Sequence, residues 1–123
     1  MTGNFYGNIA EMTFRHLRNL WGEEMFRQLK SIPVSYKRQG YIFFLCLNYN
    51  YLSEEMKQRI VQLCIDISAE DYRPLFKFLT TNPDEMPAWR IAGEYFIPVN
   101  RLYKLRKEFY IKYESKYKYE NCA

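Results

Sequence analysis

Side chains that could bind a polyanion gather in one short segment, residues 101–118. This segment has seven bases against two acids, a balance of about +5, whereas the whole chain of 123 residues carries only +4. A local excess of this kind favours a polyanionic partner such as a nucleic acid. A solvated, lysine-rich helix face is the plain alternative. The bases are Arg101, Lys104, Arg106, Lys107, Lys112, Lys116 and Lys118.

Helical spacing divides these side chains into two sets. In a helix that starts near residue 98, residues three and four apart share a face, which predicts an outward set with amide, phenol and basic groups. Its members are Asn100, Arg101, Tyr103, Lys104 and Lys107. Asparagine can pair with adenine, and lysine or arginine with guanine or phosphate, so this set could contact duplex DNA. A second set would hold or steer phosphates: Arg106, Lys112, Lys116 and Lys118.

The basic segment belongs to a predicted pair of helices joined by a tight bend. Pro87 opens the first helix, the chain bends near Phe96 and Ile97, and Pro98 presets the backbone in the first turn of the second helix. Apolar residues at helical spacing are expected to face inward from both helices. They are Ile91, Ala92 and Tyr95, and then Leu102, Leu105, Phe109, Tyr113 and Tyr117.

Over about residues 71–118 the chain resembles the helix-turn-helix of bacterial and phage DNA-binding proteins. The residues that match that pattern are Ile91, Ala92, Tyr95, Phe96, Ile97, Leu102 and Leu105. The resemblance implies that residues 98–107 lie in the major groove of double-stranded DNA, with residues 71–81 as the supporting first helix. Proteins of this kind commonly act as dimers, which makes a homodimer possible.

Phe96 departs from the family pattern, because it stands where the turn usually has glycine. A non-glycine residue at positive φ is costly. The sequence therefore predicts either a wider turn or a Phe96 ring packed into the core.

The rest of the chain also reads as helical. Helices are predicted over residues 4–30, 36–52 and 53–68, the last capped by Ser53, and a further helix capped by Ser68 or Asp71 precedes a loop over residues 80–87. The nearly continuous apolar run of residues 36–52 fits a buried strand as well, although helical neighbours favour a helix. Trp21 and Trp89 are expected to anchor the core.

We thus expect a small all-α, multi-helix bundle with a C-terminal helix-turn-helix and a long last helix. It would form a single domain over residues 1–123, in which residues 1–68 make an N-terminal helical core and residues 71–118 the helix-turn-helix part.

The sequence offers little to catalysis or metal binding. His16 is the single histidine and has no acidic neighbour in sequence, and Cys46, Cys64 and Cys122 are too widely spaced for a zinc site. Cys46 and Cys64 read as small buried hydrophobes. We expect no enzyme, no cofactor and no metal. The absence of a signal-peptide pattern and of a long apolar run predicts a cytoplasmic protein without a membrane partner.

Two functions fit these observations. The first is duplex-DNA binding, as a transcriptional regulator or as an accessory protein of a phage or mobile element. The second is a helical module for protein–protein interaction, whose last helix would present the aromatic stripe of Phe109, Tyr113 and Tyr117. DNA binding predicts that Leu102 and Leu105 are buried, and the second function predicts an exposed stripe.

Overall fold

The computed structural model describes residues 32–118, and in this part of the chain every regular element is helical. The predicted all-α fold is confirmed. The helix predicted over residues 4–30, with His16 and Trp21, and also Cys122, lie outside the described residues. The elements are α3 (Tyr36–Leu47), the 3₁₀ turn η1 (Tyr49–Tyr51), α4 (Glu54–Ser68), the 3₁₀ turn η2 (Ala69–Asp71), α5 (Tyr72–Thr80), α6 (Ala88–Glu94) and α7 (Val99–Tyr117).

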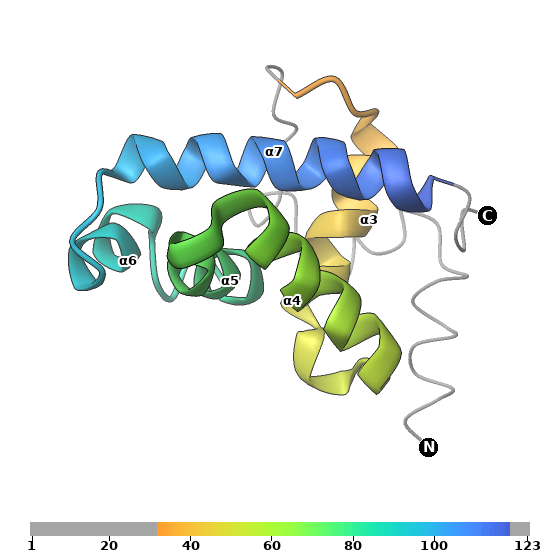
Figure 1. Cartoon of the computed structure of the whole chain (residues 1–123), viewed down its shortest axis with the longest axis horizontal. Helices are drawn as coiled ribbons and strands as arrows, with labels where there is room; N and C mark the ends of the chain where they lie inside the picture. The colour runs from red at the N-terminus through yellow and green to blue at the C-terminus, as the bar shows by residue number, and fades with distance from the viewer. Residues whose placement is uncertain (1–31, 119–123) are drawn as a thin grey trace.

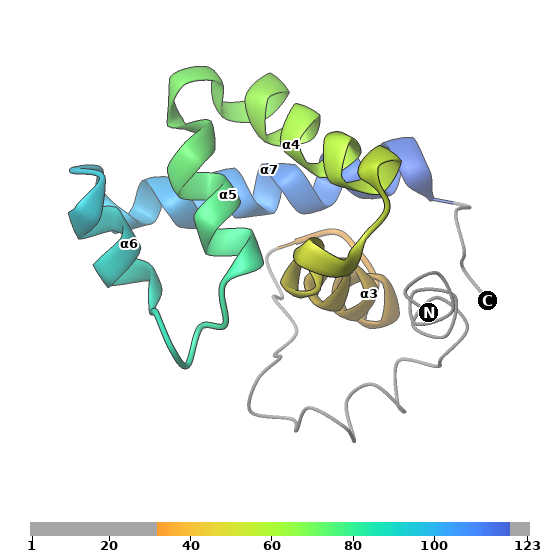
Figure 2. The same ribbon diagram turned by 90° about the horizontal axis from the view of Figure 1, so that it is seen from below.

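The long helix α7 is the element on which the others assemble. It runs the length of the molecule, and α4, α5 and α6 lie along one side of it (Figure 1). Seen from below, α5 and α6 lie against its N-terminal half, while α3 lies nearer its C-terminal half (Figure 2).

The predicted apolar stripe of α7 forms the core. Leu102, Leu105, Phe109 and Tyr113 are fully buried, as helical spacing predicts, and Tyr117 is half-buried at the end of the stripe. The side chains that pack against Leu105, Phe109 and Tyr113 come from α3, α4 and α5. One helix face therefore joins segments that are far apart in the sequence.

Side-chain hydrogen bonds mark the start of α4 and the end of α3. The Ser53 hydroxyl accepts a hydrogen bond of 3.3 Å from the Met56 backbone N–H, which confirms the predicted cap of α4. The segment 36–52 is a helix rather than a strand, but it ends at Leu47. There the Asn48 side chain donates to the Phe44 carbonyl, 2.8 Å away, and the Asn48 backbone N–H donates to the same carbonyl at 3.1 Å.

Asp71 precedes α5 as predicted, with Pro74 in the first turn, but its side chain makes no capping bond. The carboxylate instead accepts a hydrogen bond of 3.1 Å from Nε of Arg101 on α7. A tertiary contact has replaced a local one at this helix start.

A nearly buried ion pair ties α3 to the C-terminal end of α7. Nε of Arg38 lies 2.7 Å from a carboxylate oxygen of Glu114, and Nη2 of Arg38 donates to the carbonyl of Tyr117 at 3.3 Å. A guanidinium near the last carbonyls of a helix also interacts favourably with its dipole. The contact fixes which part of α7 faces α3.

Cys46 and Cys64 are buried free thiols, as predicted. Burial raises the pKa of Cys64 to about 12, so its thiol remains protonated at neutral pH. No helix among residues 32–118 is long and apolar enough to cross a membrane.

The central position of α7 gives a first prediction. Phe109→Ala should lower the free energy of unfolding by about 3–5 kcal/mol, because it leaves a cavity where α7 meets the rest of the core. Phe109→Leu should cost less than about 1.5 kcal/mol, because most of the apolar volume remains. Urea unfolding followed by circular dichroism measures both.

The control is Lys112→Ala on the exposed surface of the same helix, which should change stability by no more than about 0.5 kcal/mol. A Phe109→Ala variant as stable as this control would mean that α7 is not the centre of the core.

Candidate nucleic-acid interface

Helices α6 and α7 are joined by a bend and share a small apolar cluster of their own. Ile91 and Ala92 of α6 and Leu102 of α7 are buried in it, and Ile97 packs against them from the bend. The sequence predicts the inward positions of Ile91, Ala92 and Leu102. Tyr95, also predicted to face inward, is 37% exposed, and the Nζ atom of Lys77 lies 5.9 Å from its ring centroid.

The bend is a tight turn with Phe96 in a left-handed conformation, at φ 57°. The Ile97 N–H donates to the Ala92 carbonyl at 3.0 Å, and the Phe96 N–H donates to the Gly93 carbonyl at 3.3 Å. This pair of bonds is the Schellman motif, in which the residue that corresponds to Phe96 is usually glycine.

Both predictions for Phe96 are therefore wrong. The turn is not widened, and the ring is 94% exposed rather than packed into the core. Two backbone hydrogen bonds and the apolar contact of Ile97 offset the cost of a non-glycine residue at positive φ. Pro98 follows as the residue just before the first turn of α7.

The outward face of α7 is exposed as predicted. Asn100, Tyr103, Lys104 and Lys107 are all exposed, and their spacing of three and four residues places them on one side of the helix. We call these four residues the α7 strip. Ile111 continues the strip one turn further and is 37% exposed.

Arg101 lies at the edge of the strip, where it is half-buried and held by Asp71. The remaining predicted phosphate contacts do not lie together. Lys112 is exposed but follows Lys107 by five residues, about 140° around the helix. Lys116 and Lys118 are exposed further along, near the C-terminal end of α7.

Arg106 does not extend into solvent. Its guanidinium carbon lies 4.9 Å from the ring centroid of Phe78 on α5 and 5.2 Å from that of Tyr103 on α7. Burial among these rings lowers the pKa of Arg106, because desolvation penalises its charged form. The sequence shows a base at this position but not the ring of Phe78, which lies 28 residues earlier in the chain.

Trp89 is the clearest error of the sequence analysis in this region. The sequence predicts a core anchor, but the side chain is 69% exposed on α6. Helical spacing contains part of the signal, because Ala88, three and four residues before Ile91 and Ala92, completes the buried side of α6, and Trp89 is turned about 100° from Ala88.

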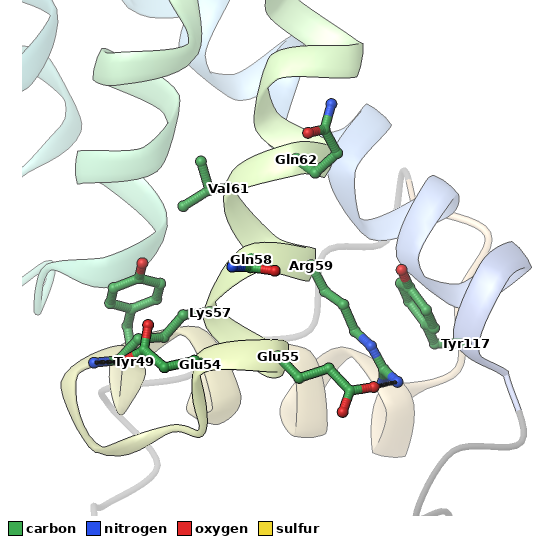
Figure 3. A pocket seen from close by; sticks show the side chains of 9 residues that line it. All are labelled: Tyr49, Glu54, Glu55, Lys57, Gln58, Arg59, Val61, Gln62 and Tyr117. Atoms are coloured by element: carbon green, nitrogen blue, oxygen red, sulfur yellow. Dashed lines mark hydrogen bonds and ion pairs between the residues drawn. The ribbon is translucent and has the colours of Figure 1, made fainter.

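A second surface feature is a shallow groove of about 500 Å³ along α4, near the C-terminal end of α7 (Figure 3). Arg59 lines it. Its Nη2 atom lies 2.8 Å from a Glu55 carboxylate oxygen, and its guanidinium lies 4.9 Å from the Tyr117 ring centroid. Lys57 pairs with Glu54 at 3.6 Å. The charges that line this groove thus largely neutralise one another, in contrast to the α7 strip.

Among residues 32–118, no three histidine, cysteine or acidic side chains lie close enough together to hold a metal ion. Comparisons with protein-family models, with curated protein sequences and with solved structures find no match. The geometry of α5, α6 and α7 is therefore the basis for assigning a function.

The left-handed Phe96 generates the second prediction. Phe96→Gly should raise the free energy of unfolding by about 0.5–1 kcal/mol, because relief of the backbone strain exceeds the greater entropy of glycine in the unfolded chain. Phe96→Ala keeps the strained backbone and loses only the exposed ring, so its stability should equal that of the natural protein. Urea unfolding of the three proteins measures the difference, and a destabilised Phe96→Ala variant would contradict the exposed position of the ring.

Proposed function

We propose that this protein binds duplex DNA through α6, the turn at Phe96, and α7, as a helix-turn-helix does. The observation on which the proposal rests is the division of α7 into two faces. Leu102 and Leu105 are buried, while Asn100, Lys104 and Lys107 are exposed on the other side of the helix. A recognition helix needs this division, because its inner face must be anchored while its outer face enters the major groove.

The α7 strip supplies suitable groups for reading base edges. The Asn100 side chain can pair with adenine through two hydrogen bonds, and Lys104 and Lys107 can reach guanine or phosphate. Tyr103 adds a hydroxyl at the edge of the strip. Arg101 is preoriented by Asp71, which limits the side-chain entropy lost on binding. Lys112, Lys116 and Lys118 would attract the DNA backbone from other sides of the helix.

A single recognition helix of this kind contacts only a few base pairs. Two copies of the protein would read two half-sites about one helical turn of DNA apart, as is common for such proteins. We therefore propose a homodimer on DNA, with a role in transcriptional regulation or as an accessory protein of a phage or mobile element. This part of the proposal is supported by the resemblance of residues 71–118 to helix-turn-helix proteins.

The alternative, a protein-interaction module, has less support. It requires an exposed aromatic stripe on α7, but Phe109 and Tyr113 are fully buried and Tyr117 is half-buried. A partner protein would have to use another surface.

The third prediction tests DNA binding directly. Fluorescence anisotropy of a labelled mixed-sequence duplex, titrated with the protein at several salt concentrations, should show binding that weakens steeply as salt rises. Lys104→Ala/Lys107→Ala should weaken binding about tenfold or more and should reduce the slope of log K against log salt by about two.

The matched control is Lys37→Ala/Lys57→Ala, which removes the same charge from α3 and α4, away from the α7 strip. It should retain most of the affinity. No binding of the natural protein at low salt would overturn the proposal, and equal losses in the two double variants would show that only net charge matters.

A further inference from the structure

Among the described arginines that lie against an aromatic ring, Arg106 is half-buried without an acid, whereas Arg73, 5.8 Å from the Tyr72 ring centroid and also without an acid, is exposed. Arg38 lies 4.7 Å from the ring centroid of Tyr41 and is paired with Glu114. Arg59 lies 4.9 Å from that of Tyr117 and is paired with Glu55. Within residues 32–118, Arg106 has two rings and no carboxylate within ion-pair distance.

The lack of an anion at Arg106 is costly inside the fold. Its Nε atom is shut off from solvent and has no hydrogen-bond partner. Arginine is rarely buried without an acid, because a desolvated charge is stable only when it is paired. Aromatic faces compensate in part through cation–π attraction, but they accept no hydrogen bond in the plane of the guanidinium. An external anion at the terminal nitrogens would supply the missing counter-charge.

The site borders the α7 strip through Tyr103. The Tyr103 and Phe78 rings touch each other edge to face, with centroids 6.0 Å apart, and the guanidinium lies against both. Tyr103 is exposed and belongs to the strip. The terminal nitrogens of Arg106, unlike Nε, are not shut off from solvent. An anion that lies beside the strip could therefore accept two hydrogen bonds from the planar edge of the guanidinium.

We propose that Phe78, Arg106 and Tyr103 form a binding site for one backbone phosphate of the DNA duplex. The inference rests on the proposed function and adds one particular contact to it. The two rings hold the guanidinium in place before DNA arrives, so that less desolvation and side-chain ordering remain to be done on binding. Phe78 thus acts as a positioning residue, through Arg106.

The partner expected here is a phosphate rather than a carboxylate of another protein. Lys107, one residue after Arg106, adds positive charge on the neighbouring side of the helix, and Lys104 lies further round on the strip. A polymer with regularly spaced phosphates can satisfy Arg106 and these lysines together, and a planar guanidinium suits two phosphate oxygens.

The fourth prediction uses the Nε–H nuclear magnetic resonance signal of Arg106 in the full-length protein. Titration with inorganic phosphate, and separately with a short mixed-sequence duplex, should shift this signal in a saturable way. The Nε–H signal of Arg59 is the internal control, because that guanidinium also lies against a ring but already has a carboxylate.

Binding measurements complete the test. Arg106→Gln should weaken duplex binding about tenfold and should reduce the salt slope by about 0.9, whereas Arg59→Gln should leave both unchanged. Phe78→Leu keeps the charge and most of the apolar volume but removes a ring, and it should weaken binding about threefold. Phe78→Tyr restores the ring and should restore binding.

The outcomes separate the two proposals. If the duplex binds but Arg106→Gln behaves like the natural protein and the Arg106 signal does not move, this site is refuted while DNA binding stands. If phosphate shifts the Arg106 signal but no duplex binds, the anion site stands and DNA binding fails. A signal that responds to an acidic peptide but to neither phosphate nor DNA would overturn the choice of partner.

Discussion

Burial of one face of α7 is the constraint on which the structure depends. The residues from Leu102 to Tyr113 that face inward collect side chains from α3, α4, α5 and α6, so the core exists only when this helix is in place. The same packing determines what remains outside. Because an α-helix has two sides, anchoring Leu102 and Leu105 necessarily turns Asn100, Lys104 and Lys107 outward.

The turn before α7 shows how a tertiary arrangement tolerates an unfavourable residue. Phe96 stands in the left-handed conformation although glycine would adopt it at lower cost. The Schellman hydrogen bonds and the buried contact of Ile97 fix the geometry, and the side chain at the strained position simply projects into solvent. The angle between α6 and α7 is thus set by backbone bonding and Ile97, not by the identity of residue 96.

Electrostatics in this protein follow a repeated scheme of arginines placed on aromatic rings. Arg38 and Arg59 each also pair with a carboxylate, nearly buried at Arg38 and more exposed at Arg59. At Arg106 the rings are present without the acid, in the part of the molecule where the α7 strip concentrates uncompensated lysines. A contact that is incomplete within the folded chain is suited to completion by a ligand, at the expense of some stability.

Within residues 32–118 the sequence by itself determined the helices, the Ser53 cap and the two faces of α7, because helical periodicity and capping depend on residues only three or four positions apart. It placed the α7 strip correctly for the same reason. Tertiary structure alone decided the contacts between distant residues: Glu114 beside Arg38, Asp71 beside Arg101, and Phe78 beside Arg106. It also decided the exposure of Phe96, because burial depends on which neighbours arrive and not on how apolar a side chain is.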